Sequence, residues 1–191
     1  DTWKSRGLGD VYKRQIEWQN KIGLVSQNNF IFSGTLYENI HLYSKNTNKK
    51  NLDDCIKIVN LEKFVESLEQ KGDTLIGEGA RELSGGQKQK INIARALYRN
   101  PKILILDEAT SSQDYENEKI IEQLINRLKG KITIITVAHR LNLIRNADMI
   151  YAFHKGKIIE CGNHEVLTAK KGYYFNPVSY THLRAHETSR Y

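Results

Sequence analysis

The hydrophobic residues of this chain follow two alternating periods. Short apolar runs, typical of buried strands in a parallel sheet, occupy residues 22–25, 103–106 and 131–137. Apolar residues recur at helical spacing along residues 52–70, 88–98 and 119–129. Residues 149–162 predict a hairpin that turns at Lys155 and Gly156. Strand and helix alternate from residue 101 onward, which predicts an α/β fold with a parallel-sheet core.

The stretch from about residue 28 to residue 100 differs, because its periodicity is mostly helical. We therefore expect a helical lobe inserted into the parallel-sheet core. The 191 residues are 39% hydrophobic, which suits a single core. The sequence contains no apolar run of about 18 residues, so no membrane-spanning helix is expected within it.

Ser84 and Gln87 form an S-x-x-Q capping box, which predicts that a helix begins here. Gly85 and Gly86 leave the first turn without side chains, so its N–H groups and the positive end of the helix dipole are open to an anion. Phosphate is the natural anion for such a place. On its own this motif is more often a simple helix start, and its meaning depends on the motifs that follow.

Two adjacent carboxylates follow the strand predicted over residues 103–106. Asp107 and Glu108 stand at its carboxyl end, the edge at which open α/β sheets bind ligands. In phosphoryl transfer, the first carboxylate of such a pair holds Mg²⁺, and a neighbouring group orients or deprotonates the attacking water. His139 follows the next predicted strand and can reach the same edge. An acidic turn or a structural histidine explains each feature alone, but their common edge favours phosphoryl-transfer chemistry.

Together these motifs resemble those of the ABC-type ATPases, a family of P-loop NTPases. Segments 83–87, 103–108 and 111–114 are similar to the ABC signature loop, Walker B and the D-loop. Gln27 resembles the Q-loop glutamine, and His139 resembles the switch histidine. The likeness extends from about residue 16 to residue 175, the part identified as an ABC ATPase domain.

The resemblance implies a role for each of these residues. Glu108 would polarise the attacking water, and His139 would contact the γ-phosphate of ATP. Asp107 and Gln27 would organise Mg²⁺. Further contacts to the nucleotide would come from Ser84, Gly85, Gly86, Gln87 and Asp114. The signature residues would act in trans, on nucleotide held by a second ABC ATPase domain in a homodimer or heterodimer.

The flanking sequence resembles exporters in particular. Residues 30–40 are similar to the stretch that follows the Q-loop in exporters whose ATPase domain is fused behind a transmembrane domain. Residues 77–79 fall where exporters carry a loop that touches that domain. The resemblance therefore implies a motor at the cytoplasmic face of the cell membrane that powers export through ATP-driven dimerisation. The chain itself is expected to be soluble.

Two other interpretations are kept open. DNA-repair and chromosome-maintenance ATPases also carry a signature loop and Walker B, but they insert a long coiled coil between the two halves of the ATPase. The stretch from Gln27 to Leu83 is short and has no sustained heptads, which favours the exporter. A catalytically degenerate regulatory subunit is the second alternative, because Gln113 is polar where the D-loop usually has an apolar residue. Glu108 and His139 argue against degeneration.

One motif of the family does not occur in this sequence. No segment matches the phosphate-cradling P-loop, G-x-x-x-x-G-K-[ST], and too few residues precede Gln27 to hold it with its strand and helix. We expect the chain to be a fragment that starts after this loop and is inactive alone. Residues 1–15 and 176–191 carry no periodicity that continues the domain, and we expect them to be non-native tails.

Charge and cysteines change this picture little. The net charge of +7 suggests nucleic acid, but part of it lies in the expected tails, and the basic stretch 45–50 has no interleaved aromatic residues. No nucleic-acid partner is expected. Cys55 and Cys161 stand far apart without metal-binding spacing, which is typical of free thiols in a reducing cytosol.

Overall fold

The computed structural model describes residues 15, 17–42, 47–107, 115–138 and 141–175. The chain divides into two compact units, residues 1–137 and residues 138–191. The sequence did not predict this boundary, because it falls between a strand and a short helix with no change in composition.

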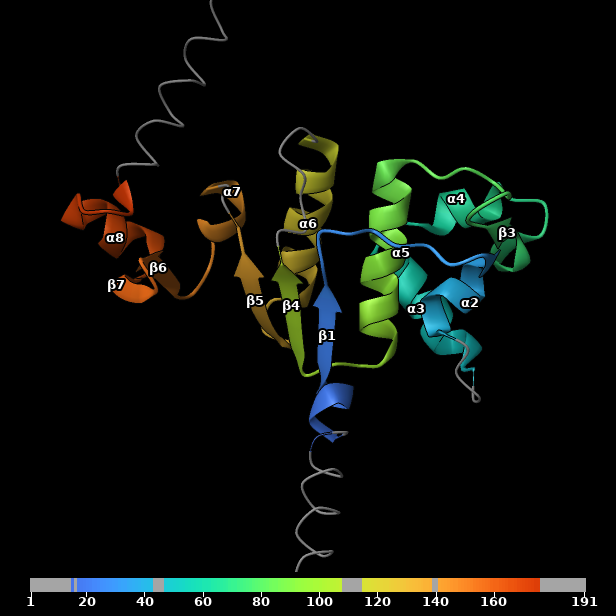
Figure 1. Cartoon of the computed structure of the whole chain (residues 1–191), viewed down its shortest axis with the longest axis horizontal. Helices are drawn as coiled ribbons and strands as arrows, with labels where there is room; N and C mark the ends of the chain where they lie inside the picture. Colours follow the sequence, from blue (N-terminus) through green and yellow to red (C-terminus); the bar gives the residue numbers. More distant parts are fainter. Residues whose placement is uncertain (1–14, 16, 43–46, 108–114, 139–140, 176–191) are drawn as a thin grey trace, which may run out of the picture. The chain divides into compact units, whose positions relative to one another are not determined.

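The first unit is built on a three-stranded sheet (Figure 1). Its strands are β1 (Ile22–Val25), β4 (Ile103–Asp107) and β5 (Thr133–Val137), in the order β1-β4-β5. Both pairings are parallel, with Leu24 opposite Ile105 and Ile105 opposite Ile135. The parallel-sheet core predicted from the alternation of strand and helix is confirmed.

Only one face of this sheet is buried by the described residues. Gly23, Leu104 and Leu106 lie on the buried face, whereas Leu24 and Ile135 on the other face are 59% and 48% exposed. Helix α5 (Gly85–Tyr98) packs against β1 and against α6 (Tyr115–Leu128). The apolar runs had predicted strands buried on both faces, and the structure differs because these helices supply a single layer.

Helices dominate the segment inserted between β1 and β4. It contains α2 (Leu36–His41), α3 (Lys49–Ile58), α4 (Glu62–Glu66), a 3₁₀ turn η1 (Lys71–Asp73) and α5. A short antiparallel ribbon joins β2 (Gly34–Thr35) to β3 (Leu75–Ile76), which the sequence did not predict. The helical lobe expected within the sheet core is therefore present, with a small ribbon added.

The helical stripe predicted along residues 52–70 is interrupted in the structure. Helix α3 ends at Ile58 and α4 begins at Glu62, because Asn60 between them adopts a left-handed conformation with φ of 55°. Leu52, Ile56 and Leu68 are nevertheless buried as their spacing predicted.

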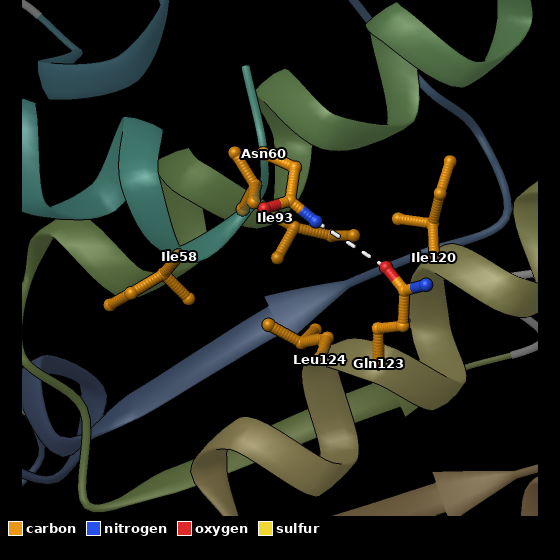
Figure 2. Close-up of a pocket in the computed structure, with 7 residues that line it drawn as sticks. Ile58, Asn60, Ile93, Ile120, Gln123 and Leu124 are labelled. Carbon is orange, nitrogen blue, oxygen red and sulfur yellow. Dashed lines mark hydrogen bonds between the residues drawn. The ribbon is translucent and has the colours of Figure 1, made fainter. Parts of the chain in front are cut away.

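Helix α6 holds this turn through polar side chains. Asn60 Nδ2 donates a hydrogen bond to Gln123 Oε1 at 3.3 Å (Figure 2). Arg127 donates to the carbonyl oxygens of Lys57 and Ile58, at 2.9 and 2.8 Å, and to Asn60 Oδ1 at 2.9 Å. These carbonyls belong to the last turn of α3, so a side chain from α6 caps that helix.

The second unit has its own small core. It contains α7 (Leu141–Ile144), β6 (Ile150–His154), β7 (Lys157–Gly162) and α8 (His164–Lys170). Strands β6 and β7 pair antiparallel and turn at Lys155 and Gly156, which confirms the predicted hairpin. Ile150, Leu167 and Tyr174 form the core. Across the described parts of both units, we find no helix with the length and apolar character needed to cross a bilayer.

Candidate functional site

The start of helix α5 is a capped turn with two glycines. Ser84 Oγ accepts a hydrogen bond from the Gln87 N–H at 3.2 Å, and Gln87 Oε1 accepts one from the Ser84 N–H at 3.0 Å. The predicted capping box is therefore confirmed. Ser84 and Gly85 are exposed, and Gly86 is partly exposed. Gly85 and Gly86 contribute first-turn amides that no carbonyl within the helix can serve, which suits an approaching phosphate.

The carboxyl edge of the sheet brings Gln27 and Asp107 onto neighbouring strands. Val25 pairs with Leu106, so Gln27 follows β1 just past this edge, and Asp107 ends β4 beside it. Both side chains are exposed. An amide oxygen and a carboxylate oxygen are hard donors of the kind that Mg²⁺ takes, together with water and phosphate oxygens. The two residues present therefore fit the metal that the family resemblance implies.

The capped turn and this edge point to the same side of the first unit. Helix α5 runs antiparallel to β4, so its N-terminus lies toward the carboxyl ends of the strands (Figure 1). Asn92 Nδ2 donates to Asn29 Oδ1 at 3.4 Å, which places Asn92 close to the segment after Gln27. Ser84 precedes Asn92 by eight residues, so it stands about 12 Å further along the helix axis. Within one chain, the glycine turn reaches past the Gln27–Asp107 edge.

Three candidate residues lie outside the described residues: Glu108, Asp114 and His139. The strands that precede Glu108 and His139 are described, and Asp107 of β4 pairs with Val137 of β5. The assigned roles of these three residues stay predictions. Residues 1–14 and 176–191 also lie outside the described residues, so their assignment as tails stays a prediction as well.

A buried polar cluster beside the edge was missed by the sequence reasoning. Asn39 of α2 is 1% exposed; its Oδ1 accepts from the Phe32 N–H at 2.8 Å, and its Nδ2 donates to the Phe32 carbonyl at 2.9 Å. Arg95 Nε donates to the Asn39 carbonyl at 2.7 Å, and Arg95 Nη1 donates to the Phe30 carbonyl at 2.9 Å. Burial lowers the pKa of Arg95 from its ordinary value. An arginine among the apolar positions of a helix was the available signal.

Gly77 brings the loop at residues 77–79 against the segment that follows β1. Its φ is 107°, and a Cβ at this position would lie 2.8 Å from the Phe32 carbonyl oxygen and 2.9 Å from Ser33 Cα. Only glycine permits both this backbone conformation and this close approach. The loop that falls where exporters touch their transmembrane domain and the stretch that resembles the exporter sequence after the Q-loop are therefore neighbours in space.

Known proteins are similar to this chain in sequence and in fold. The family model described as ABC transporter matches residues 2–111. Multidrug resistance protein 1 of Entamoeba histolytica is 48% identical over 174 residues, which cover 88% of this chain and 13% of that protein. P-glycoprotein 14 of Caenorhabditis elegans is 41% identical over 177 residues, covering 92% of this chain and 13% of that protein. The chain thus spans a small part of the curated relatives that it matches.

A solved structure agrees with these relatives. The structure described as a bacterial Atm1-family ABC exporter with ATP bound matches with a TM-score of 0.76 and 32% sequence identity. The match covers 85% of this chain and 28% of that chain. The expected α/β fold of the ABC ATPase type, with its parallel sheet and helical lobe, is confirmed. On its sequence and its fold, the chain belongs to the ABC transporter family.

Proposed function

We propose that this chain is the ATP-binding and hydrolysing domain of an ABC-type membrane exporter, and that it powers transport by ATP-driven dimerisation. The observation that carries the proposal is the separation between the Ser84 turn, which suits a phosphate, and the sheet edge with Gln27 and Asp107, which suits Mg²⁺. The glycine turn at Ser84 stands about 12 Å along α5 from Asn92, which lies beside the segment after Gln27. One nucleotide would meet both groups most readily if each came from a different domain.

The proposed chemistry assigns one task to each part of the site. Asp107 and Gln27 would hold Mg²⁺, which neutralises charge on the phosphates when it is bound. Glu108 would orient and polarise the attacking water, and His139 would contact the γ-phosphate. The Ser84 turn would then close on that phosphate from the partner domain, a homologous or identical ABC ATPase domain.

The partners and location of this domain are also proposals. The relatives named above include a multidrug resistance protein, a P-glycoprotein and an exporter, and each is much longer than this chain. We propose that a transmembrane domain is fused upstream and that the ATPase domain lies on the cytoplasmic side of the membrane. The neighbouring segments around Phe32 and Gly77 would face this partner.

The isolated chain is proposed to bind ATP poorly. A helix N-terminus contributes about 0.3 to 2 kcal/mol toward an anion. Even a ligand with a Kd of about 1 mM needs about 4 kcal/mol of binding free energy. The 191 residues contain no P-loop to supply the difference.

Turnover of ATP by the full-length transporter tests the proposed function. We expect Glu108→Gln to lower Mg²⁺-dependent turnover by about 10²- to 10⁴-fold, because a group that moves a proton in the transition state is lost. ATP should remain bound, and dimerised domains should accumulate. Glu66→Gln, an exposed position at the end of α4, is the matched control and should leave turnover unchanged.

Three results would contradict parts of this proposal. Undiminished turnover of the Glu108→Gln variant would remove Glu108 from its role. A wild-type transporter that binds but does not turn over ATP would favour the regulatory subunit instead. Turnover that requires DNA would favour the chromosome-maintenance alternative.

A further inference from the structure

The segment that follows β1 is irregular, yet its backbone is firmly held. Residues 29–32 belong to neither a helix nor a strand. Phe32 still has both its N–H and its carbonyl bonded to the Asn39 side chain, at 2.8 and 2.9 Å. Asn39 Nδ2 also donates to the Thr35 carbonyl at 3.0 Å. A side chain from α2 therefore replaces the ladder that a neighbouring strand would provide.

Arg95 connects this segment to helix α5. Its Nη1 donates to the Phe30 carbonyl at 2.9 Å, and its Nη2 donates to Asn39 Oδ1 at 3.1 Å. Its Nε reaches the Asn39 carbonyl at 2.7 Å, so the guanidinium uses both ends of its planar fork. Within α5, Nη1 also donates to Asn92 Oδ1 at 2.6 Å.

The same guanidinium lies over an aromatic pair. Arg95 Cζ is 4.9 Å from the centre of the Phe32 ring, within the range of a cation–π contact. The Phe32 and Phe30 rings meet edge to face, with their centres 4.8 Å apart. Phe30 is 61% exposed and Phe32 is 38% exposed. Arg95 therefore fixes both the backbone and the exposed aromatic side chains of the segment.

The two elements that Arg95 connects, the segment after Gln27 and helix α5, both adjoin residues of the candidate site. Gln27 precedes the held segment by only a few residues, and Ser84 caps the helix that bears Arg95. We propose that Arg95 is a positioning residue that locks the segment after Gln27 to the helix that presents the Ser84 turn, so that both move as one body. This inference builds on the proposed function.

Arg127 provides a matched control. It makes a similar set of hydrogen bonds from α6, but to the turn between α3 and α4. Arg127→Ala removes an arginine that braces the same unit, and the hydrogen bonds of Arg127 to described residues go to Lys57, Ile58 and Asn60 rather than to the segment after Gln27. Arg95→Lys keeps the charge on a good helix former, but an ammonium cannot reproduce the planar fork.

The test uses the full-length transporter and measures kcat and KM for Mg²⁺-ATP together with amide hydrogen exchange. We expect Arg95→Ala to lower kcat by about 10²-fold, because groups displaced by about 1 Å lose catalytic alignment. KM should change by less than about threefold, since the Arg95 guanidinium is bonded to groups of its own domain. Arg95→Lys should show a smaller loss of kcat in the same direction. Exchange over residues 28–33 should rise in both Arg95 variants and stay at the wild-type level in Arg127→Ala.

The positioning role is overturned if Arg95→Ala keeps kcat within about threefold of the wild type. It is also overturned if Arg127→Ala loses kcat to the same extent, because the loss would then reflect general stability. If Arg95→Ala does not fold, Arg95→Lys decides by the same two readouts. A wild-type protein without ATP turnover would refute the proposed function, whereas unchanged exchange over residues 28–33 in the variants would refute the positioning role.

Discussion

Ser84 has two roles in this account, and substitution by aspartate separates them. Its hydroxyl caps α5 by accepting the Gln87 N–H at 3.2 Å, and its exposed turn is proposed to meet the γ-phosphate of a partner's nucleotide. Aspartate caps helices as well as serine does, and its charge suits the helix N-terminus. Ser84→Asp should therefore leave the fold intact while placing a negative charge where a phosphate is expected.

The two effects have different magnitudes. Loss of the cap in Ser84→Ala should cost about 1 kcal/mol, which corresponds to about 2–4 °C in the unfolding midpoint of a domain this size. In Ser84→Asp the cap is retained, so the midpoint should not fall. Two unit charges about 4 Å apart at an effective dielectric constant of about 20 repel by about 4 kcal/mol. At about 1.4 kcal/mol per tenfold, ATP turnover should drop by about 10³-fold.

Thermal unfolding and ATP turnover of the full-length transporter measure both effects. Asn48→Asp is the matched control, because Asn48 caps α3 by accepting the Asn51 N–H at 3.2 Å and the proposed site does not include it. This control should keep both the unfolding midpoint and the turnover of the wild type. If Ser84→Asp turns over ATP within about threefold of the wild type, no phosphate approaches this turn during catalysis.

Two further predictions concern packing in the first unit. Burial, with a smaller contribution from Asp54, raises the thiol pKa of Cys55 from 9.0 to about 11. The folded state therefore favours the neutral thiol, so the contribution of Cys55 to the free energy of unfolding is complete below pH 9.0 and is lost as the pH rises toward 11. Alkylation at about pH 8 should be far slower at buried Cys55 than at exposed Cys161. Equal alkylation rates would contradict the burial of Cys55. Gly23→Ala should destabilise the protein by about 1–3 kcal/mol in denaturant unfolding, because the new methyl group would lie 2.8 Å from the Ala96 carbonyl oxygen. The control Ser26→Ala, at an exposed position nearby, should leave the free energy of unfolding unchanged. A Gly23→Ala variant as stable as the wild type would show that α5 does not lie this close to β1.

The features that the sequence predicted correctly depend on neighbouring residues. The capping box at Ser84 joins residues three positions apart, so its hydrogen bonds are encoded in one short segment. The hairpin turn at Lys155 and Gly156 is local in the same way. The parallel sheet could be predicted because strands alternating with helices leave few other arrangements.

The features that the sequence did not reveal depend on distant residues. Arg95 and Asn39 are 56 positions apart, and neither residue type signals the other. The break at Asn60 depends on a left-handed residue supported by Arg127, which lies 67 positions away. Apolar spacing showed which residues of the strands could be buried, but it could not show that the described helices cover only one face of the sheet.

The central claim is that one nucleotide is held between the Gln27–Asp107 edge of one domain and the Ser84 turn of another. A structure of the full-length Glu108→Gln transporter with ATP and Mg²⁺ tests it most directly. We predict that Asp107 and Gln27 oxygens lie beside the metal, while the Ser84 hydroxyl and the Gly86 amide from the opposite domain face the γ-phosphate. A nucleotide that meets both groups within one domain, or an ATP-bound dimer in which the Ser84 turn faces solvent, would contradict the claim.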